Sequence, residues 1–174
     1  MSKAVKIHPE LNQVLLDNQN ILNYDILSVD IGSRTRNLFT TPGVSEHCIS
    51  TRPISQLEGR LKTHEQQLEN RLESPIVFIC GGGLAGIEIA FGLFDRWRSR
   101  FSSLQIIILN SSPELVPSYV PRVRNAIKRA LAERNIKLIE GCNIVRVSKS
   151  SICIKTQSTI YFLRKLFLSL VYLL

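Results

Sequence analysis

Apolar residues form short, nearly uninterrupted runs at Ile76–Cys80, 104–109 and 136–140. Such runs are typical of strands that a parallel sheet buries on both faces. Between the runs, apolar residues recur at helical spacing from Leu84 onward and again from Pro121 onward. This order of strands and helices predicts an α/β fold with a parallel sheet and right-handed βαβ crossovers.

The first fifty residues show a different, β-rich pattern. A short apolar run at Gln13–Leu16 precedes four Asp, Asn and Gln residues at 17–20, which are typical of a turn. A second β-rich stretch follows at 24–33 and contains Gly32 near its end. We expect a hairpin here, followed by a longer strand over 24–33 that ends in a tight turn at Gly32.

A stripe of leucines at helical spacing runs through residues 57–72 and predicts a helix that packs one face on the domain. Charged and polar residues, Glu65 among them, occupy the other face, which we expect to be exposed. Further along, β-type segments at 143–147 and 152–156 flank a serine-rich turn. Together they predict an antiparallel ribbon.

The last fifteen residues, 160–174, are apolar apart from Arg164, Lys165 and Ser169. They are shorter than the roughly 20 residues that span a bilayer. Three interpretations remain: a final buried strand, an interfacial anchor, or a non-native end. The two charges argue against the bilayer centre. We therefore expect the tail to add to the edge of the domain or to cause aggregation, and we do not favour membrane association.

Charge is distributed unevenly along the 174 residues, which carry a net charge of +8. Basic residues dominate 96–174, and this favours an anionic partner such as nucleotide phosphates, an acidic protein, a membrane surface or nucleic acid. The run Arg96–Arg100 has a simpler explanation, because cations are favourable at a helix C-terminus. We therefore expect no nucleic-acid binding.

The cysteines and histidines carry no motif. The four cysteines contain no CxxC pair, which excludes a zinc ribbon or a thioredoxin-type redox pair. The three histidines are scattered, so no metal site is expected. The polar N-terminus resembles no secretory signal, and we expect a cytoplasmic location with free thiols.

Gly81, Gly83 and Gly86 form a GxGxxG motif directly after a predicted buried strand and at the start of a predicted helix. The first glycine permits a sharp turn, the second lets backbone approach a diphosphate, and the third allows close packing of helix on strand. The helix N-terminus offers N–H groups to the phosphates. A structural glycine turn is the alternative. The motif predicts a Rossmann-like dinucleotide-binding domain.

The residues around the motif refine this prediction. The second strand of such a domain usually ends in an acid that bonds the adenosine ribose, but Asn110 stands here, so NAD and NADP are not distinguished. Glu88 either points to the nicotinamide side or simply stabilises the helix N-terminus. The candidate cofactor-binding residues around the motif are Gly81, Gly82, Gly83, Leu84, Ala85, Gly86, Glu88 and Asn110.

The stretch from Ile76 to Glu88 resembles the NAD(P)H-binding module of FAD-dependent pyridine nucleotide-disulfide oxidoreductases, where an apolar strand runs into GGGxxGxE. The segment 24–33 occupies the place of that family's YDxLxxATG strand. Its form DIGS at Asp30–Ser33 is similar to the type II NADH dehydrogenase-like branch, and to the oxidoreductase module fused to some selenide, water dikinases. The resemblance covers residues 7–156.

The resemblance implies that NAD(P)H docks at the glycine motif and passes a hydride to FAD, from which electrons go to a quinone or another acceptor. It places Glu88 near the nicotinamide ribose. It also places Asp30 and Gly32 at a turn whose backbone approaches the flavin. Catalytic residues are not identified by it.

The family's N-terminal motif for the flavin diphosphate has no counterpart in this sequence. We therefore expect a middle slice of such an enzyme, either a fragment, a mis-spliced product or a degenerate relative, which does not bind FAD by itself. A complementary flavin-domain chain is a candidate partner. The alternative is a non-catalytic nucleotide-binding or partner module, membrane-associated or tied to selenophosphate synthesis. The expected divisions are a flavin-domain remnant at 1–50, a linker helix at 51–74, the Rossmann-like NAD(P)H domain at 75–157 and the tail at 158–174.

Overall fold

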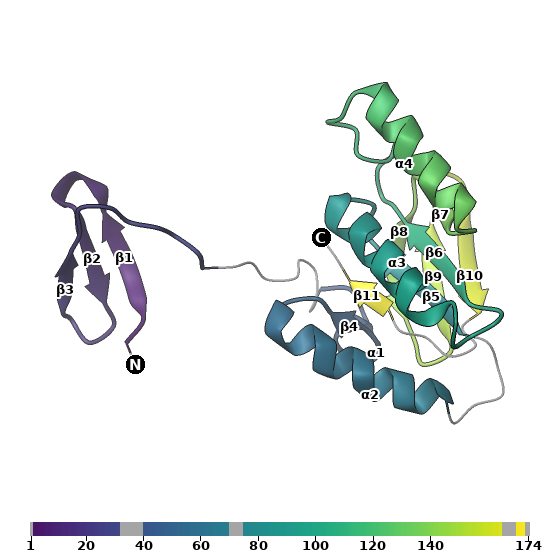
Figure 1. Ribbon diagram of the computed structural model, residues 1–174, viewed down its shortest axis with the longest axis horizontal. Coiled ribbons are helices and arrows are strands. Elements are labelled where there is room, and N and C mark those ends of the chain that lie inside the picture. The colour runs from purple at the N-terminus through teal and green to yellow at the C-terminus, as the bar shows by residue number, and fades with distance from the viewer. Residues whose placement is uncertain (1, 32–39, 70–74, 165–169, 173–174) are drawn as a thin grey trace. The chain divides into compact units, whose positions relative to one another are not determined.

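The computed structural model describes residues 2–31, 40–69, 75–164 and 170–172 (Figure 1). The chain divides into two compact units, Met1–Gly32 and Ser33–Leu174. This division lies before the predicted boundary at residue 50. The segment between the two positions contributes a helix and a strand to the second unit, as described below.

The first unit is a three-stranded antiparallel sheet, in the order β1 (Ala4–His8), β2 (Gln13–Leu16), β3 (Ile21–Asn23). A 3-10 turn over Pro9–Leu11 joins the first two strands. The predicted hairpin is confirmed, because the turn at 17–20 connects β2 and β3.

The predicted strand over 24–33 is wrong for the residues that the structure describes. The strand β3 ends at Asn23, and residues 24–31 have no regular secondary structure. Ile26 and Ile31 are 91% and 89% exposed. Extended backbone becomes a strand only beside a hydrogen-bonding neighbour, and no described strand of this chain pairs with 24–31. Gly32 lies outside the described residues.

The second unit contains a five-stranded parallel sheet in the order β4 (Ile49–Ser50), β11 (Leu170–Tyr172), β5 (Ile76–Cys80), β6 (Gln105–Leu109), β7 (Lys137–Ile139). Helix α3 (Leu84–Trp97) connects β5 to β6, and α4 (Pro121–Glu133) connects β6 to β7. The predicted α/β fold with a parallel sheet is therefore confirmed. A short helix α1 (Val44–His47) and helix α2 (Leu57–Glu69) precede β5.

A second, antiparallel sheet follows in the order β10 (Ile160–Arg164), β9 (Ser151–Lys155), β8 (Asn143–Val147). The predicted ribbon is β8 and β9, and the tail adds β10 at its edge. The tail also supplies β11, which lies between β4 and β5 in the parallel sheet. The tail is thus part of both sheets, and only β10 has the predicted edge position. Within the described residues, no helix is both long and apolar enough to cross a membrane.

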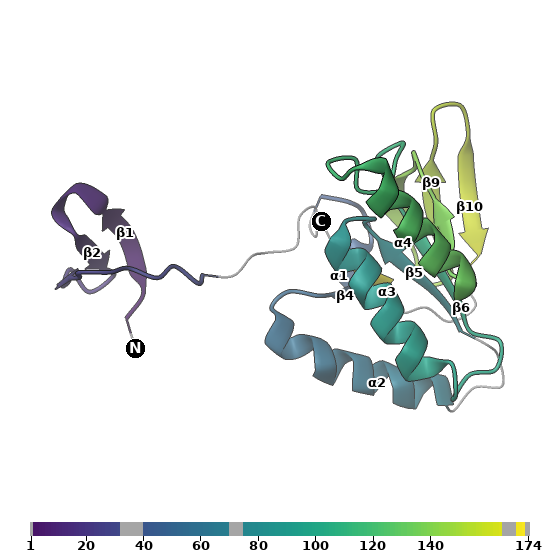
Figure 2. The same ribbon diagram turned by 45° about the horizontal axis from the view of Figure 1, so that its top comes forward.

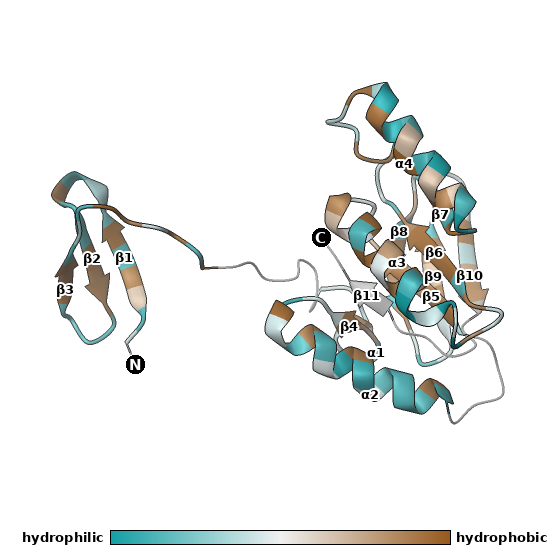
Figure 3. Ribbon diagram, viewed as in Figure 1, coloured by the Kyte–Doolittle hydropathy of each residue, from teal (hydrophilic) through white to brown (hydrophobic). Residues whose placement is uncertain are grey.

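The parallel sheet has a separate hydrophobic core on each face, because successive strand residues point to opposite sides. In β5, Val77 and Ile79 belong to the core shared with α2 and α3, whereas Phe78 and Cys80 belong to the core shared with the antiparallel sheet. Figures 1 and 2 show α2, α3 and α4 on one side of the parallel sheet and the antiparallel sheet on the other, where Val44 of α1 also packs. This double burial explains why β5 and β6 are apolar along their length, as the colouring of Figure 3 shows.

Glu65 joins α2 to α3 and is only 5% exposed, so its predicted place on an exposed helix face is wrong. Its carboxylate accepts hydrogen bonds from Arg96, including one of 3.0 Å at Nη2, and from Trp97 Nε1 at 2.6 Å. Arg100 Nη1 lies 3.3 Å away. These partners, led by the Arg96 hydrogen bond, lower the pKa of Glu65 to about 2. A carboxylate tolerates burial when charged neighbours satisfy it, and the basic run supplies them here.

Candidate functional site

The glycine motif forms the turn between β5 and α3. Gly81 has a φ of 119°, a conformation that residues with a side chain rarely adopt. Its N–H donates a 2.9 Å hydrogen bond to the carbonyl of Leu109, the last residue of β6. The turn is thereby held at the carboxyl edge of the parallel sheet, where open α/β sheets bind their ligands.

Gly82 and Gly83 have opposite surroundings. A Cβ built on Gly82 would lie 2.8 Å from atoms of the Asn110 side chain, which is too close for packed atoms. A Cβ built on Gly83 would meet nothing within 4 Å, and Gly83 is exposed. Packing against Asn110 therefore explains why position 82 is a glycine. The protein itself imposes no such limit at Gly83, and the space beside it is open to a ligand.

Helix α3 begins at this turn without a capping group. Its N-cap is Gly83, no side chain caps the helix, and its first turn contains no acidic residue. Leu84 and Ala85 are exposed, whereas Gly86 is buried against the sheet side of the helix. The first N–H groups and the positive end of the helix dipole are thus available to an anion. A diphosphate is such an anion, so these residues fit a bound dinucleotide.

Glu88 lies one turn into α3 and is exposed. It falls outside the first turn of the helix, and this weakens the interpretation that it only stabilises the helix N-terminus. Its side chain forms no hydrogen bond or ion pair with the described residues. It is therefore free to contact a ligand that follows the open side of α3.

Asn110 is buried beneath the site and holds the loop that follows β6. It is 7% exposed, and its Nδ2 donates to the carbonyls of Ser112 at 3.0 Å and Glu114 at 3.1 Å. Its backbone N–H donates to Ile139 at 2.8 Å, and its carbonyl accepts from Cys142 at 3.0 Å. Both amide hydrogens are used in holding the loop after β6. The structure therefore gives Asn110 a role in supporting the loop, and its assignment as a cofactor-binding residue stays a prediction.

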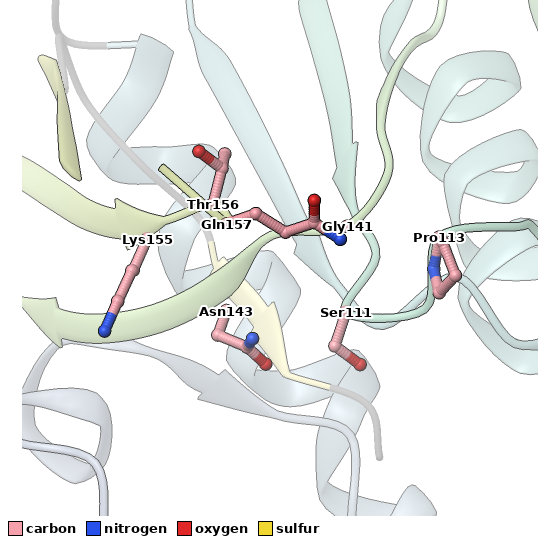
Figure 4. A pocket seen from close by; sticks show the side chains of 7 residues that line it. All are labelled: Ser111, Pro113, Gly141, Asn143, Lys155, Thr156 and Gln157. Carbon is pink, nitrogen blue, oxygen red and sulfur yellow. The ribbon is translucent and has the colours of Figure 1, made fainter. Parts of the chain in front are cut away.

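A hollow of about 420 Å³ lies beyond the carboxyl ends of β6 and β7 (Figure 4). Seven residues line it: Ser111, Pro113, Gly141, Asn143, Lys155, Thr156 and Gln157. A smaller hollow of about 320 Å³ overlaps it and reaches Glu140 and Ser158. In dinucleotide-binding folds, the adenosine ribose lies at the end of the second strand, which is β6 in this chain. The hollow lies at this end of β6, and most of the residues that line it are polar.

The loop that forms one wall of this hollow is anchored by Glu140. Its carboxylate accepts a hydrogen bond from the Leu115 N–H at 2.5 Å and one from Lys128 Nζ at 2.7 Å. Arg124 pairs with Glu114 and donates to the Tyr119 carbonyl at 3.1 Å. Helix α4 therefore fixes the loop through two cations, Lys128 and Arg124.

Sequence reasoning missed most of the residues around the hollow. Ser111 and Gly141 could have been found, because each comes just after a predicted parallel strand and such positions meet at one edge of the sheet. Lys155 and Asn143 could not, because they come from the antiparallel sheet and meet the site only in the folded chain. The two residues are cross-strand partners in the register of β8 and β9.

Two predicted positions belong to the first unit of the chain. Asp30 is exposed in the first unit, and Gly32 lies outside the described residues. Burial raises the pKa of the Cys80 thiol well above its usual value and also raises that of Cys142, so neither is a ready nucleophile. Among the described residues, no group of His, Cys, Asp and Glu side chains could hold a metal ion.

Comparison with known proteins identifies the family. The model for pyridine nucleotide-disulphide oxidoreductases matches residues 1–166 of this chain. The chain belongs to this family. The predicted resemblance to this family is therefore confirmed, and so is the predicted similarity to NADH dehydrogenase-like proteins.

Two relatives in this family illustrate the likeness. An external alternative NAD(P)H-ubiquinone oxidoreductase B1 of Solanum tuberosum mitochondria is 25% identical over 178 residues, which cover 91% of this chain and 31% of the relative. The NADH dehydrogenase-like protein YutJ of Bacillus subtilis is 26% identical over 137 residues, which cover 79% of this chain and 36% of the relative. The chain thus spans about a third of the length of these pyridine nucleotide-disulphide oxidoreductases.

Solved structures show the same fold. NDH2 of Plasmodium falciparum, in complex with NADH, is similar with a TM-score of 0.69 and 18% identity, covering 97% of this chain and 39% of that protein. The sulfide:quinone oxidoreductase of Aquifex aeolicus is similar with a TM-score of 0.68 and 18% identity, covering 97% and 41%.

Proposed function

We propose that this chain binds NAD(P)H as the nucleotide-binding part of a flavin-dependent oxidoreductase. The dinucleotide diphosphate lies on the N-terminus of α3, between Gly83 and the first turn. The adenosine occupies the hollow beside Ser111, and the nicotinamide lies on the side of Glu88. The bound cofactor supplies the hydride chemistry, and this chain holds and orients it.

One observation carries this proposal: α3 begins with an uncapped N-terminus beside the open space at Gly83. A side-chain oxygen at the N-cap commonly satisfies one of the first N–H groups of a helix, and α3 has none. A ligand diphosphate fills the same need and brings two charges to the positive end of the dipole. The matching family and the likeness to an NADH-bound structure support this assignment.

The flavin is assigned to a site that this chain does not complete. By resemblance, Asp30 and Gly32 approach FAD, and a complementary flavin-domain chain supplies the rest of its site. The acceptor is a quinone, as the names of relatives indicate, or another oxidant. We also propose a cytoplasmic location, which the unpaired thiols of Cys80, Cys142 and Cys153 support.

Titration with NADH, followed by nucleotide fluorescence at low and high salt, tests the proposal. Saturable binding that persists at high salt supports a built dinucleotide site. Binding that disappears with salt, and that any polyanion displaces equally, would contradict it and favour a basic surface that attracts anions in general. The purified chain should be colourless; stoichiometric FAD in the preparation would overturn the assignment of the flavin site to a complementary chain.

A further inference from the structure

The antiparallel sheet of the second unit has one covered edge and one open edge. At the β8 edge, the Val147 N–H donates a 2.9 Å hydrogen bond to the Pro42 carbonyl, and Val44 of α1 packs nearby. At the other edge, β10 pairs with β9, and no described strand pairs with its outer side (Figure 2). The strand β10 has a regular register and contains no proline. Because bulges and prolines are among the features that protect an edge from pairing, this edge is suited to accept a further strand.

The direction of the backbone groups in β10 follows from the turn that joins it to β9. The Thr156 N–H donates a 2.9 Å hydrogen bond to the Thr159 carbonyl, so these two residues form a hydrogen-bonded pair. Successive pairs along an antiparallel ladder are alternately bonded and not bonded. In the register of β9 and β10, Ile160 and Phe162 therefore belong to pairs that are not bonded, and their N–H and C=O groups point to the open edge. These groups can form main-chain hydrogen bonds with an added strand.

The same two residues also expose apolar side chains. Ile160 is 54% exposed and Phe162 is 71% exposed. Leu163 packs in the core beneath the antiparallel sheet, so the alternating residue Phe162 and its neighbour Ile160 point to the opposite, outer face. An added strand would cover such side chains with its own. Backbone and side chains thus favour the same kind of ligand, an extended peptide.

The charge around β10 indicates which side chains that peptide carries. Residues 141–174 contain five Lys or Arg residues and no Asp or Glu. Three of these cations, Arg146, Lys149 and Lys155, are exposed and form no ion pair within the described residues. Lys155 is the partner of Ile160 in the register of β9 and β10. A second copy of this strand would bring the same positive charge, whereas a strand with acidic side chains would be attracted.

An anionic membrane also attracts cations that lie beside exposed aromatic residues, but the open edge of β10 argues against it. Backbone N–H and C=O groups that enter hydrocarbon must be paired with other protein groups. The outward groups of Ile160 and Phe162 would lose water there without gaining partners. A peptide strand supplies those partners.

We propose that β10 binds an extended acidic segment of a partner protein by strand addition. The main chain of the segment pairs with Ile160 and Phe162, and its apolar side chains cover those of the same two residues. Its carboxylates approach the cations of the antiparallel sheet. This binding requires no nucleotide, so the inference stands or fails independently of the proposed function.

Fluorescence anisotropy with two labelled peptides tests this inference in the full chain. One probe is a capped nine-residue peptide of alternating valine and glutamate, and the other alternates valine and lysine. The acidic peptide should bind saturably and at least about tenfold more tightly than the basic peptide. Added salt should weaken this binding, because part of the affinity is electrostatic, but should not abolish it.

Two substitutions at one position separate backbone pairing from apolar contact. Phe162→Pro removes the N–H that faces the open edge, whereas Phe162→Thr keeps that N–H and removes the ring. The proline variant should lose at least about tenfold in affinity for the acidic peptide, and the threonine variant about threefold. Ile160→Pro should act like Phe162→Pro, and it lies at the first residue of the strand, where proline is tolerated. Circular dichroism verifies that each variant is folded.

Equal binding of the two peptides, or of neither, would overturn the inference. Equal losses in Phe162→Pro and Phe162→Thr would do the same, because they would show an apolar contact without strand pairing. Binding to phosphatidylserine vesicles in place of the acidic peptide would assign the surface to a membrane. A dimer that Phe162→Pro dissociates, in place of peptide binding, would assign it to a second copy of the chain, and either result also contradicts the proposal.

Discussion

Gly82 packs so closely against Asn110 that a single added carbon would lie 2.8–2.9 Å from three atoms of the asparagine side chain. Asn110 cannot move away easily, because its Nδ2 is bonded to the Ser112 and Glu114 carbonyls. The contact ties the glycine turn after β5 to the loop after β6. The two parts of the proposed site, the diphosphate turn and the adenosine hollow, are therefore joined by one pair of residues.

Substitution of Gly82 should show that Gly82 and Asn110 contribute jointly to the free energy of unfolding. Gly82→Ala should reduce the free energy of unfolding by about 1–3 kcal/mol, the usual cost of overpacking. Asn110→Ala removes two of the three opposing atoms, Cγ and Oδ1, and keeps Cβ, so the double variant should lose less stability than the sum of the two single variants. Urea denaturation measures all three. Strict additivity would show that the side chain of Asn110 does not limit Gly82.

The sequence and the structure predict different results for the replacement of Asn110 by aspartate. By sequence, Asn110→Asp restores the acid that usually binds the ribose and should favour NADH. By structure, it removes both amide donors and places a carboxylate against two carbonyl oxygens, at a cost of about 1–3 kcal/mol for the unsatisfied groups. We expect a less stable domain with no gain in NADH affinity. Thermal denaturation with an NADH titration checks this, and tighter NADH binding in a domain of unchanged stability would contradict it.

The pKa of Glu65 predicts how stability depends on pH. Its folded pKa of about 2 lies below the ordinary value of 4.5, so its stabilising contribution is complete above about pH 4.5 and is lost as pH falls towards 2. The shift corresponds to at most about 3 kcal/mol. Glu65→Gln should therefore cost about 2–3 kcal/mol at neutral pH and flatten the fall in stability between pH 4.5 and 2.

A matched control for this substitution is Glu69→Gln. It removes a half-exposed carboxylate from α2, the helix that also carries Glu65, and this carboxylate pairs with Arg100. It should cost less than about 1 kcal/mol, as surface ion pairs do. Urea denaturation between pH 2 and 7 measures both variants. If Glu65→Gln is no more destabilising than Glu69→Gln, the buried carboxylate does not hold α2 on α3.

The sequence predicted the elements that depend on local pattern. The apolar run at β5 and the motif at Gly81–Gly86 were sufficient to predict a parallel sheet, a βαβ unit and the glycine turn between β5 and α3. The sequence could not predict features that need distant partners. Glu65 looked exposed because its partners Arg96 and Trp97 lie 31 and 32 residues away. The apolar segment 24–31 looked like a strand because its composition does not show whether a neighbouring strand is present.

Some residues of the candidate site could likewise be predicted from the sequence, and others could not. Gly83 and the open end of α3 follow from the motif, since the spacing of the glycines already defines the turn. The role of Asn110 does not, because it depends on loop carbonyls two and four residues ahead that the fold turns towards it. Lys155 enters the site only through the register of β8 and β9.

The most direct test of the proposed function is NAD(P)H binding by Gly83→Val, with Gly92→Val as its control. Gly83 is the exposed N-cap of α3 and Gly92 is exposed within the helix, and a Cβ on either would meet no atom of another part of the protein within 4 Å. Both variants should therefore keep the circular dichroism spectrum of the parent. Only Gly83→Val places a side chain where the diphosphate approaches. We predict at least about a tenfold loss of affinity in Gly83→Val, equivalent to 1.4 kcal/mol or more, and no loss in Gly92→Val. Equal binding of NAD(P)H by the parent and by a folded Gly83→Val would contradict the proposed function.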